Sequence, residues 1–472
     1  MNIRITIRWV AVVVVAFAAL AGVSLAGNPL MRVQARSQST DYTVGGPCGA
    51  TIQACINNPI VQAGDRVLIP AGIYTESLTL NKAVSLIGAD ADTTIVQAIS
   101  DQRVMTVTGS AITATTVISG LAFTGGNLTG GFGCPLYCGG GLRITEGAQP
   151  LLQNLMIANN HTAYIGGGMY ADGKIALVNV TFMNNTATVN SGGLAGDDAV
   201  TLVDTVFMGN AAPSGGGATI YTATVKGSRF ENNSGGGLGV YDYAAIADSR
   251  FISNTTLYDG GGLWAGGTLT LTNSVFLSNT AGTGGGLKHS PDPQFVGPRP
   301  AHIVNTIFAD NHASNGAGLF LASLGQTTIL HTTIADKGLN GGTAIVIRGG
   351  VVGITDTIIA SHTMGISLTT GTVYENYNLF FGNSNNFSDT ISGGVNDVSG
   401  NPHFTNPTAN DYHLSPGSAA IDKGTYVGVK TDLDGNSRLP DYGGLRVDIG
   451  AYEAEYQGVI YHTYLPVTLK NQ

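Results

Sequence analysis

The feature that most constrains this chain is a motif that recurs roughly every 25 residues. In one copy, residues 268–287, leucines alternate with threonines, Phe276 follows, Asn279 stands three residues later, and three glycines precede Leu287. The aromatic or aliphatic position recurs as Ile157, Phe182, Phe207, Phe230, Phe251, Phe276, Phe308, Ile334 and Ile359. An asparagine follows the early copies by three residues: Asn160, Asn185, Asn210, Asn233, Asn254, Asn279 and Asn311. A period of this length is typical of stacked repeats.

Each copy predicts one coil of a parallel β-solenoid. A helical repeat would need apolar residues at a period of 3.6 and few glycines, whereas these copies have short alternating runs broken by Asn and Gly. Both residues tolerate the left-handed backbone that a sharp corner requires. Stacked coils place equivalent residues about 4.8 Å apart, so we expect the asparagines to form an amide ladder and the phenylalanines to stack inside.

Over residues 65–395 this pattern resembles the right-handed parallel β-helix proteins of the pectate-lyase-like class. The resemblance implies an all-β protein, a single-stranded β-solenoid closed at its amino-terminal end by a short cap helix. It implies no particular activity, because that fold carries lyases, hydrolases, adhesins and inert surface proteins.

Composition favours a protein outside the cell. Only 11% of the 472 residues are charged, against about 25% in average globular proteins. Solubility must therefore depend on Asn, Thr and Ser. A net charge of -9 and the lack of any Lys/Arg run argue against a nucleic-acid partner.

Residues 1–35 are expected to be a signal peptide and leader. Arg4 and Arg8 precede an apolar stretch, and Ser24-Leu25-Ala26 has the small residues of a cleavage site. An uncleaved membrane anchor is the alternative, since the apolar run approaches the length of a short span. Both interpretations place the bulk of the chain outside the cytoplasm.

Two close cysteine pairs flank short loops. Cys48 and Cys55 lie in residues 41–64, where we expect an amino-terminal cap with a short amphipathic helix over 51–57. Cys134 and Cys138 lie in an insertion between coils. In an exported chain, such pairs predict two local disulfides. A zinc site is the alternative, but neither pair has the two-residue spacing typical of one.

The carboxy-terminal part has a different character. Residues 411–424, 432–438 and 448–453 resemble blocks of the choice-of-anchor domain that follows β-helices in bacterial surface proteins. The resemblance implies such a domain over residues 396–456 and a location at a bacterial cell surface. Residues 457–472 are expected to be a tail that is too short and too polar to span a membrane.

No familiar catalytic motif is present, so candidate sites must be sought in columns of equivalent residues. Counting from the last glycine of each run, the first residue after it should point inward, and the second and fourth should point outward. These outward positions gather aromatic and charged residues on one outer face: Arg143, Tyr170, Asp172, Asp197, Tyr221, Tyr241, Trp264 and Lys288. Extended sugar chains bind such surfaces. The alternative is the ordinary surface of a tyrosine-rich β protein.

Asp172 and Asp197 occupy equivalent positions in adjacent coils. Carboxylates about 5 Å apart share a proton or hold a cation, and Asp198 stands beside them, so calcium is a candidate ligand. In pectate lyases a calcium on such a face neutralises the uronate and an Arg or Lys abstracts the proton. Arg143 is the basic residue one coil from Asp172, but no dense cluster of aspartates surrounds it.

The function we expect is that of an exported cell-surface β-helix protein, non-catalytic and glycan-binding or adhesive. The alternative is a polysaccharide lyase or glycoside hydrolase that acts on an extended acidic or neutral glycan. The expected partner is an extracellular or cell-envelope polysaccharide, and the expected state is a monomer.

Overall fold

The computed structural model describes residues 39–291, 297–338, 342–438 and 447–454. The chain divides into two compact units, Met1–Ser39 and Thr40–Gln472, and everything below concerns the second. The predicted signal peptide and the predicted tail lie outside the described residues.

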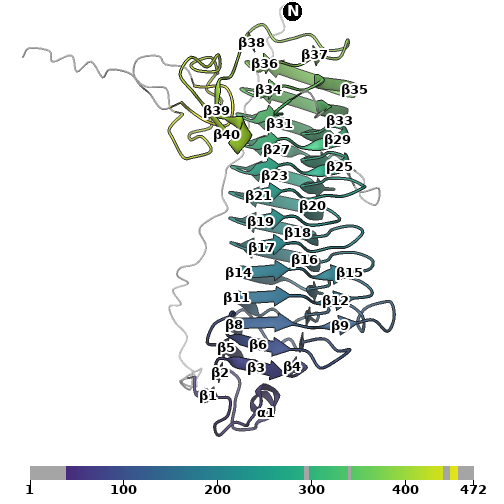
Figure 1. Cartoon of the computed structure of the whole chain (residues 1–472), viewed down its shortest axis with the longest axis vertical. Coiled ribbons are helices and arrows are strands. Elements are labelled where there is room, and N and C mark those ends of the chain that lie inside the picture. Colours follow the sequence, from purple (N-terminus) through teal and green to yellow (C-terminus); the bar gives the residue numbers. More distant parts are fainter. Residues whose placement is uncertain (1–38, 292–296, 339–341, 439–446, 455–472) are drawn as a thin grey trace, which may run out of the picture. The chain divides into compact units, whose positions relative to one another are not determined.

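The second unit is a parallel β-helix, as the repeat predicts: each coil pairs in parallel with the coils before and after it (Figure 1). The coil has three faces. The first face carries β4 (Leu78–Leu80), β7 (Met105–Val107), β10 (Leu142–Ile144), β13 (Met169–Ala171), β22 (Leu263–Ala265), β26 (Leu287–His289), β30 (Leu319–Leu321) and β37 (Asn385–Phe387). The second carries β1 (Asp41–Thr43), β2 (Arg66–Ile69), β5 (Ser85–Gly88), β23 (Thr268–Thr272), β27 (Ala301–Val304) and β31 (Gln326–Leu330).

The third face carries β3 (Gly72–Thr75), β6 (Thr94–Gln97), β17 (Val206–Met208), β19 (Arg229–Glu231), β21 (Arg250–Ile252), β24 (Val275–Leu277), β28 (Ile307–Ala309), β32 (Thr333–Ala335), β34 (Ile358–Ala360), β36 (Leu379–Phe381) and β38 (Val398–Ser399). Some strands bend from the first face into the second: β16 (Leu194–Val203), β18 (Ala218–Lys226), β20 (Leu238–Ala247), β33 (Thr343–Thr355) and β35 (Met364–Asn376). Others bend from the second into the third: β8 (Val117–Thr124), β11 (Leu151–Ala158) and β14 (Ile175–Met183). Short corner strands are β9 (Asn127–Leu128), β12 (His161–Thr162), β15 (Thr186–Ala187), β25 (Thr280–Thr283) and β29 (His312–Asn315).

Polar residues at the corner between the second and third faces adopt the left-handed conformation that lets the chain turn sharply. Their φ angles lie between 46° and 53°: Asn154, Asn179, Asp204, Asp248, Asn273, Asn305, His331 and Asp356. Asn and Asp visit this region more readily than other non-glycine residues. The recurrence of these residue types therefore follows from the turn that each coil must make.

The predicted asparagine ladder is present at the corner that follows the third face. The side-chain amide of Asn254 donates to Oδ1 of Asn279 at 3.0 Å and to the carbonyl of Phe230 at 2.8 Å. The same pair of bonds repeats from Asn160 to Asn279. These amides are buried, so each must be satisfied inside the protein.

The phenylalanine column forms one axial stack. Phe276 is fully buried, and its ring centroid lies 4.4 Å from that of Phe251 and 4.7 Å from that of Phe308. The stack continues through Phe230 and Phe207 at 4.8–4.9 Å. This confirms the register that the sequence predicts.

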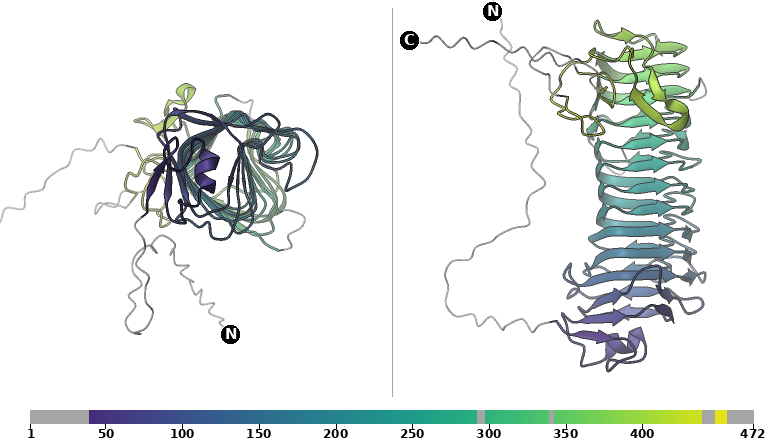
Figure 2. Two further views of the ribbon diagram at one scale, coloured as in Figure 1. Left: turned by 90° about the horizontal axis from the view of Figure 1, so that it is seen from below. Right: turned by 60° about the vertical axis from the view of Figure 1, so that its left-hand side comes forward.

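The amino-terminal end is closed by helix α1 (Ile52–Asn57), which lies across the end of the stack (Figure 2, left). The side chain of Thr51 caps it by accepting from the N–H of Ala54, as N-cap residues do. Ile52 and Cys55 are buried, and Cys55 forms the predicted disulfide with Cys48. The cap therefore covers the apolar interior that a solenoid end would otherwise expose.

At the other end, the carboxy-terminal segment packs on the outside of the third face. It contains β39 (Phe404–Asn406), the 3-10 helix η1 (Pro407–Ala409) and β40 (Asp411–Leu414), followed by loops. One apolar cluster joins outward residues of the third face to this segment: Leu277, Ile307, Ala309, Ala335, Ile358, Ala360, Leu379, Tyr412, Leu414, Ala420, Ile449 and Ala451. Later coils thus have apolar side chains both inside and outside.

Asp356 is a corner residue that also binds this segment. Its Oδ1 accepts from the N–H of Thr425 at 2.9 Å, and its carbonyl accepts from Gly450 at 2.8 Å. Burial raises the pKa of Asp356 to about 7, although the Thr425 N–H and the Arg438 charge act in the opposite direction. The packed state therefore favours a protonated Asp356 below neutral pH.

This predicts a pH dependence of stability. Between about pH 4 and pH 7 the folded protein holds a proton that the unfolded chain has released, so the free energy of unfolding falls as pH rises. For this group the loss should be about 2 kcal/mol between pH 5.5 and pH 8. Asp356→Asn should remove it, because Asn tolerates the φ of 53° and can still accept from Thr425. Guanidinium unfolding of both proteins at the two pH values measures the difference; an unchanged pH slope in the variant would contradict the prediction.

Candidate functional site

The first face holds the outward column in the predicted register. Strand pairing aligns these residues coil by coil: Arg143, Tyr170, Ala195, Thr219, Gly239, Trp264, Lys288 and Phe320. The residue before each of them points into the core and is at most 2% exposed, as with Leu238 and Leu263. Counting from the glycine run therefore assigns the direction of these side chains correctly.

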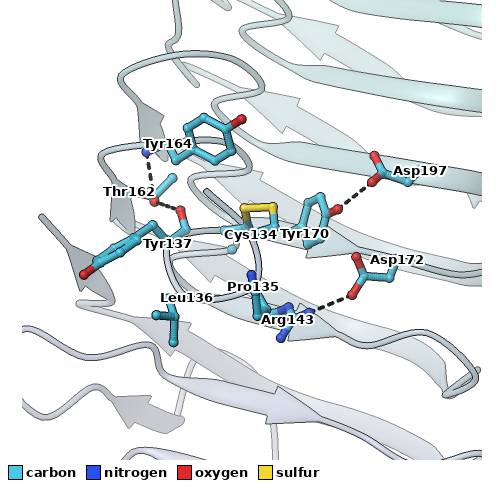
Figure 3. Close-up of a disulfide and its surroundings, with 12 residues drawn as sticks. Cys134, Pro135, Leu136, Tyr137, Arg143, Thr162, Tyr164, Tyr170, Asp172 and Asp197 are labelled. Carbon is cyan, nitrogen blue, oxygen red and sulfur yellow. Dashed lines mark hydrogen bonds and ion pairs between the residues drawn. A yellow bond between two sulfur atoms is a disulfide. The ribbon is translucent and has the colours of Figure 1, made fainter. Parts of the chain in front are cut away.

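The amino-terminal part of this face is covered by a loop. Tyr170 is only 4% exposed, because it packs with Ala195 under Cys138, which is bonded to Cys134 as predicted (Figure 3). Arg103 holds the loop by donating to the carbonyls of Gly139 and Cys138, each at 2.7 Å, and of Leu136 at 3.0 Å. A ligand on the outer face would meet this loop and not the ring of Tyr170.

The charged residues beside Tyr170 bind protein partners. Arg143 Nη2 lies 2.8 Å from Asp172 Oδ2, and the Tyr170 hydroxyl donates to Asp197 Oδ2 at 2.5 Å (Figure 3). Burial, together with these carboxylates, raises the pKa of Tyr170, which therefore stays neutral and remains a donor. Oδ1 of Asp198 accepts from the N–H of the next residue. Among the described residues, no group of three or more His, Cys, Asp or Glu side chains is arranged to hold a metal ion.

The middle of the face is open and forms a groove of about 390 Å³. Its lining residues are Ser214, Gly215, Thr219, Gly235, Gly236, Leu238, Gly239, Tyr241, Thr256, Tyr258, Asp259, Gly260, Trp264, Lys288, Ser290 and Pro291. Five of these residues are glycines, so bare backbone forms much of the floor of the groove. The lining thus comes from the first-face strands, from the corner loops before them, and from Ser290 and Pro291 after β26.

Two aromatic side chains define the groove. Tyr241 and Trp264 pack edge to face, with ring centroids 5.1 Å apart and planes at 80°. Trp264 stands beside Gly239 of the preceding coil, where a Cβ atom would lie 3.6 Å from the indole. Both aromatics are partly exposed. Tyr221 is 39% exposed on the neighbouring coil but does not line the groove.

Lys288 closes one side of the groove. Its ammonium forms an ion pair with Asp259 and lies 5.6 Å from the ring centroid of Phe320. A second ion pair, between Arg299 and Asp242 at 3.0 Å, ties the end of the Pro-rich loop to β20. The structure therefore brings Tyr241, Trp264 and Lys288 together in one groove, and separates them from the covered residues around Tyr170.

Asp259 and Tyr258 are groove residues that the sequence-based prediction missed. The prediction counted residues after each glycine run, whereas Asp259 lies before one, in the corner loop. A signal did exist: the position three before the last glycine is Cys138, Ile165, Asn190, Ser214, Ser234, Asp259, Thr283 and Asn315. The single charge in that column could have been found by the same counting.

No family model matches the chain, and no curated protein matches it. Among the described residues, no helix has the length and apolar character of a membrane span.

Similar solved structures are β-helix enzymes. The catalytic domain of a GH87 alpha-1,3-glucanase, solved with tetrasaccharides, is 12% identical with a TM-score of 0.39, over 79% of this chain and 70% of its own. The A-module of the Azotobacter vinelandii mannuronan C-5 epimerase AlgE6 is 12% identical, TM-score 0.38, over 74% and 94%. Pectate lyase Pel9A is 13% identical, TM-score 0.36, over 89% and 97%. Likenesses this distant carry no argument about function.

Proposed function

We propose that this is an exported, non-catalytic protein that binds a saccharide chain in the groove on its first face. The observation that carries the proposal is the Tyr241–Trp264 pair, partly exposed beside a glycine-lined floor. Aromatic rings stack on the apolar faces of sugar rings, and concave sites with a few polar groups fix their orientation. Thr219, Thr256 and Ser290 supply hydroxyl groups for that purpose.

A hydrolase or lyase is less well supported. Glycosidases place two carboxyl groups on either side of the scissile bond, whereas the described groove lining has one, Asp259, and it is paired with Lys288. The basic residue near the aspartates, Arg143, is bound to Asp172. A pectate-lyase-like proton abstraction would require this arginine to be released.

Export and surface attachment are part of the proposal. The two disulfides suit an oxidising compartment, and the leader has the pattern of an export signal. The resemblance of residues 396–456 to the choice-of-anchor domain supports a place at a bacterial cell surface. Detection of the protein on intact cells by an antibody, before and after protease treatment, tests this location.

Replacing Trp264 by alanine should weaken saccharide binding about tenfold, because a stacked aromatic is worth on the order of 1.5 kcal/mol. Affinity electrophoresis against a panel of soluble polysaccharides measures the change. Tyr374→Ala is the matched control: this tyrosine is 68% exposed on β35, outside the groove. Equal retention of both variants, or no retention of the unaltered protein by any member of the panel, would contradict the proposed function.

A further inference from the structure

We infer that the groove selects an uncharged saccharide and discriminates against acidic ones. The inference rests on the proposed function and names its ligand class. It follows from how the charges of the first face are paired, and from which member of each pair faces solvent.

Three ion pairs flank the outer surface of the first face, and in each the carboxylate is the more exposed partner. The side-chain exposures are 15% for Lys288 against 43% for Asp259, 22% for Arg299 against 34% for Asp242, and 15% for Arg143 against 21% for Asp172. At each of these three pairs, a ligand that approaches the face therefore meets a carboxylate oxygen before it meets the cation.

Lys288 is the one cation among the described lining residues of the groove, and protein groups already bind its ammonium. Its ammonium is bound to Asp259 and lies near the ring of Phe320, so its charge is already compensated on two sides. An acidic sugar would have to break the ion pair to reach it and would leave Asp259 exposed in the same groove. Like charges at short range disfavour that arrangement.

A neutral sugar has no such conflict. Carboxylate oxygens accept hydrogen bonds from sugar hydroxyls, and bonds to a charged acceptor are stronger than neutral ones. Asp259 can accept such bonds beside Trp264 while keeping Lys288, since a carboxylate has about four acceptor sites.

The groove also limits the length that is bound. Its lining comes from four successive coils, from Ser214 to Pro291, which span about 14–19 Å at roughly 4.8 Å per coil. Towards the amino terminus, the loop that contains Cys138 covers Tyr170 and Ala195. The groove therefore accommodates a short segment of three or so sugar units.

The test is a fluorescence titration of the full chain. The chain has two tryptophans, Trp9 and Trp264, so in a Trp9→Phe background the emission reports the groove directly. The neutral probes are hexamers of β-linked glucose, xylose and mannose; the acidic probes are hexamers of galacturonate and mannuronate. We expect at least one neutral hexamer to bind at least tenfold more tightly than either acidic one at low ionic strength.

The variant Asp259→Asn provides a second test, because it removes the ion-pair partner of Lys288 and keeps both aromatic side chains. Affinity for the acidic hexamers should rise about fivefold, the effect of one uncompensated surface charge. Asp242→Asn is the matched control, since its partner Arg299 belongs to the other ion pair, and it should change acidic binding less.

The outcomes separate the two claims. If neither class of hexamer changes the Trp264 emission, the proposed function fails. If an acidic hexamer binds the unaltered protein as tightly as the best neutral one, the groove still binds saccharides and the inference about charge is overturned. An Asp259→Asn variant with unchanged acidic affinity would also overturn it.

Discussion

Replacing Phe276 by alanine should lower the free energy of unfolding by about 3–5 kcal/mol. The ring is fully buried between those of Phe251 and Phe308, so its removal leaves a cavity in the middle of the stack. Parallel pairing on both sides of β24 fixes the spacing of the neighbouring coils. The neighbours therefore cannot collapse into the space, which places the cost in the upper range for such substitutions.

The measurement must be local as well as global, because stacked repeats can open in part. Hydrogen exchange should show faster exchange of amides in β21, β24 and β28, and chemical denaturation should give the total loss. Phe132→Ala is the control: this ring is 75% exposed, and its loss should cost about 0.5 kcal/mol or less. Similar exchange rates in the Phe276 variant and the unaltered protein would show that the stack does not stabilise the coil.

The fold could be predicted from sequence because each coil repeats the same physical problem. A corner needs a left-handed residue, which makes Asn179 and Asn273 recur, and a buried turn needs its amides satisfied, which makes Asn185 and Asn279 recur. The inward column after the glycines follows from the period of two. These three requirements depend only on residues within one coil. A sequence that meets them in many successive copies therefore predicts a parallel β-helix.

The candidate site could be predicted only in part, because a column fixes a direction and not an exposure. Tyr170 and Trp264 occupy the same column, yet the first lies under a loop and the second lines a groove. The covering loop is an insertion outside the repeat, and its path depends on contacts such as those of Arg103 that no periodicity describes.

The contacts of the carboxy-terminal segment are a second feature that could not be predicted from the sequence. Its blocks, residues 432–438 and 448–453, resemble those of a separate domain, yet they contain the residues that bind the third face of the β-helix. Asp432 accepts from the N–H of Asn436 and of Glu453, which joins the two blocks. Sequence likeness alone does not reveal that Asn305, 133 positions before Arg438, is part of the same contact.

Replacing Arg438 by alanine should detach this segment and cost about 3–5 kcal/mol, the range for removing one partner of a buried charge pair. Arg438 is 1% exposed and forms an ion pair with Glu453. Nη2 of Arg438 donates to the carbonyl of Gly450 at 2.8 Å and to Oδ1 of Asn305 at 3.4 Å. Without it, the partly buried carboxylate of Glu453 would have no cation beside it.

The Arg438 variant should lose protection only in the segment and in the strands that contact it. Limited proteolysis should cut within the segment, and hydrogen exchange should rise in the amides of β40, β28 and β34, while β13 to β22 remain protected. Arg229→Ala provides the comparison, because its ion pair with Glu231 is on the surface, with the arginine 53% exposed, and such pairs contribute at most about 1 kcal/mol. A segment that stays protected in the Arg438 variant would mean that the apolar cluster around Ile358 and Tyr412 holds it alone. We expect the opposite, because the buried guanidinium of Arg438 bonds to Glu453, Gly450 and Asn305. Its loss leaves these acceptors without their donor, a cost that apolar contacts do not offset.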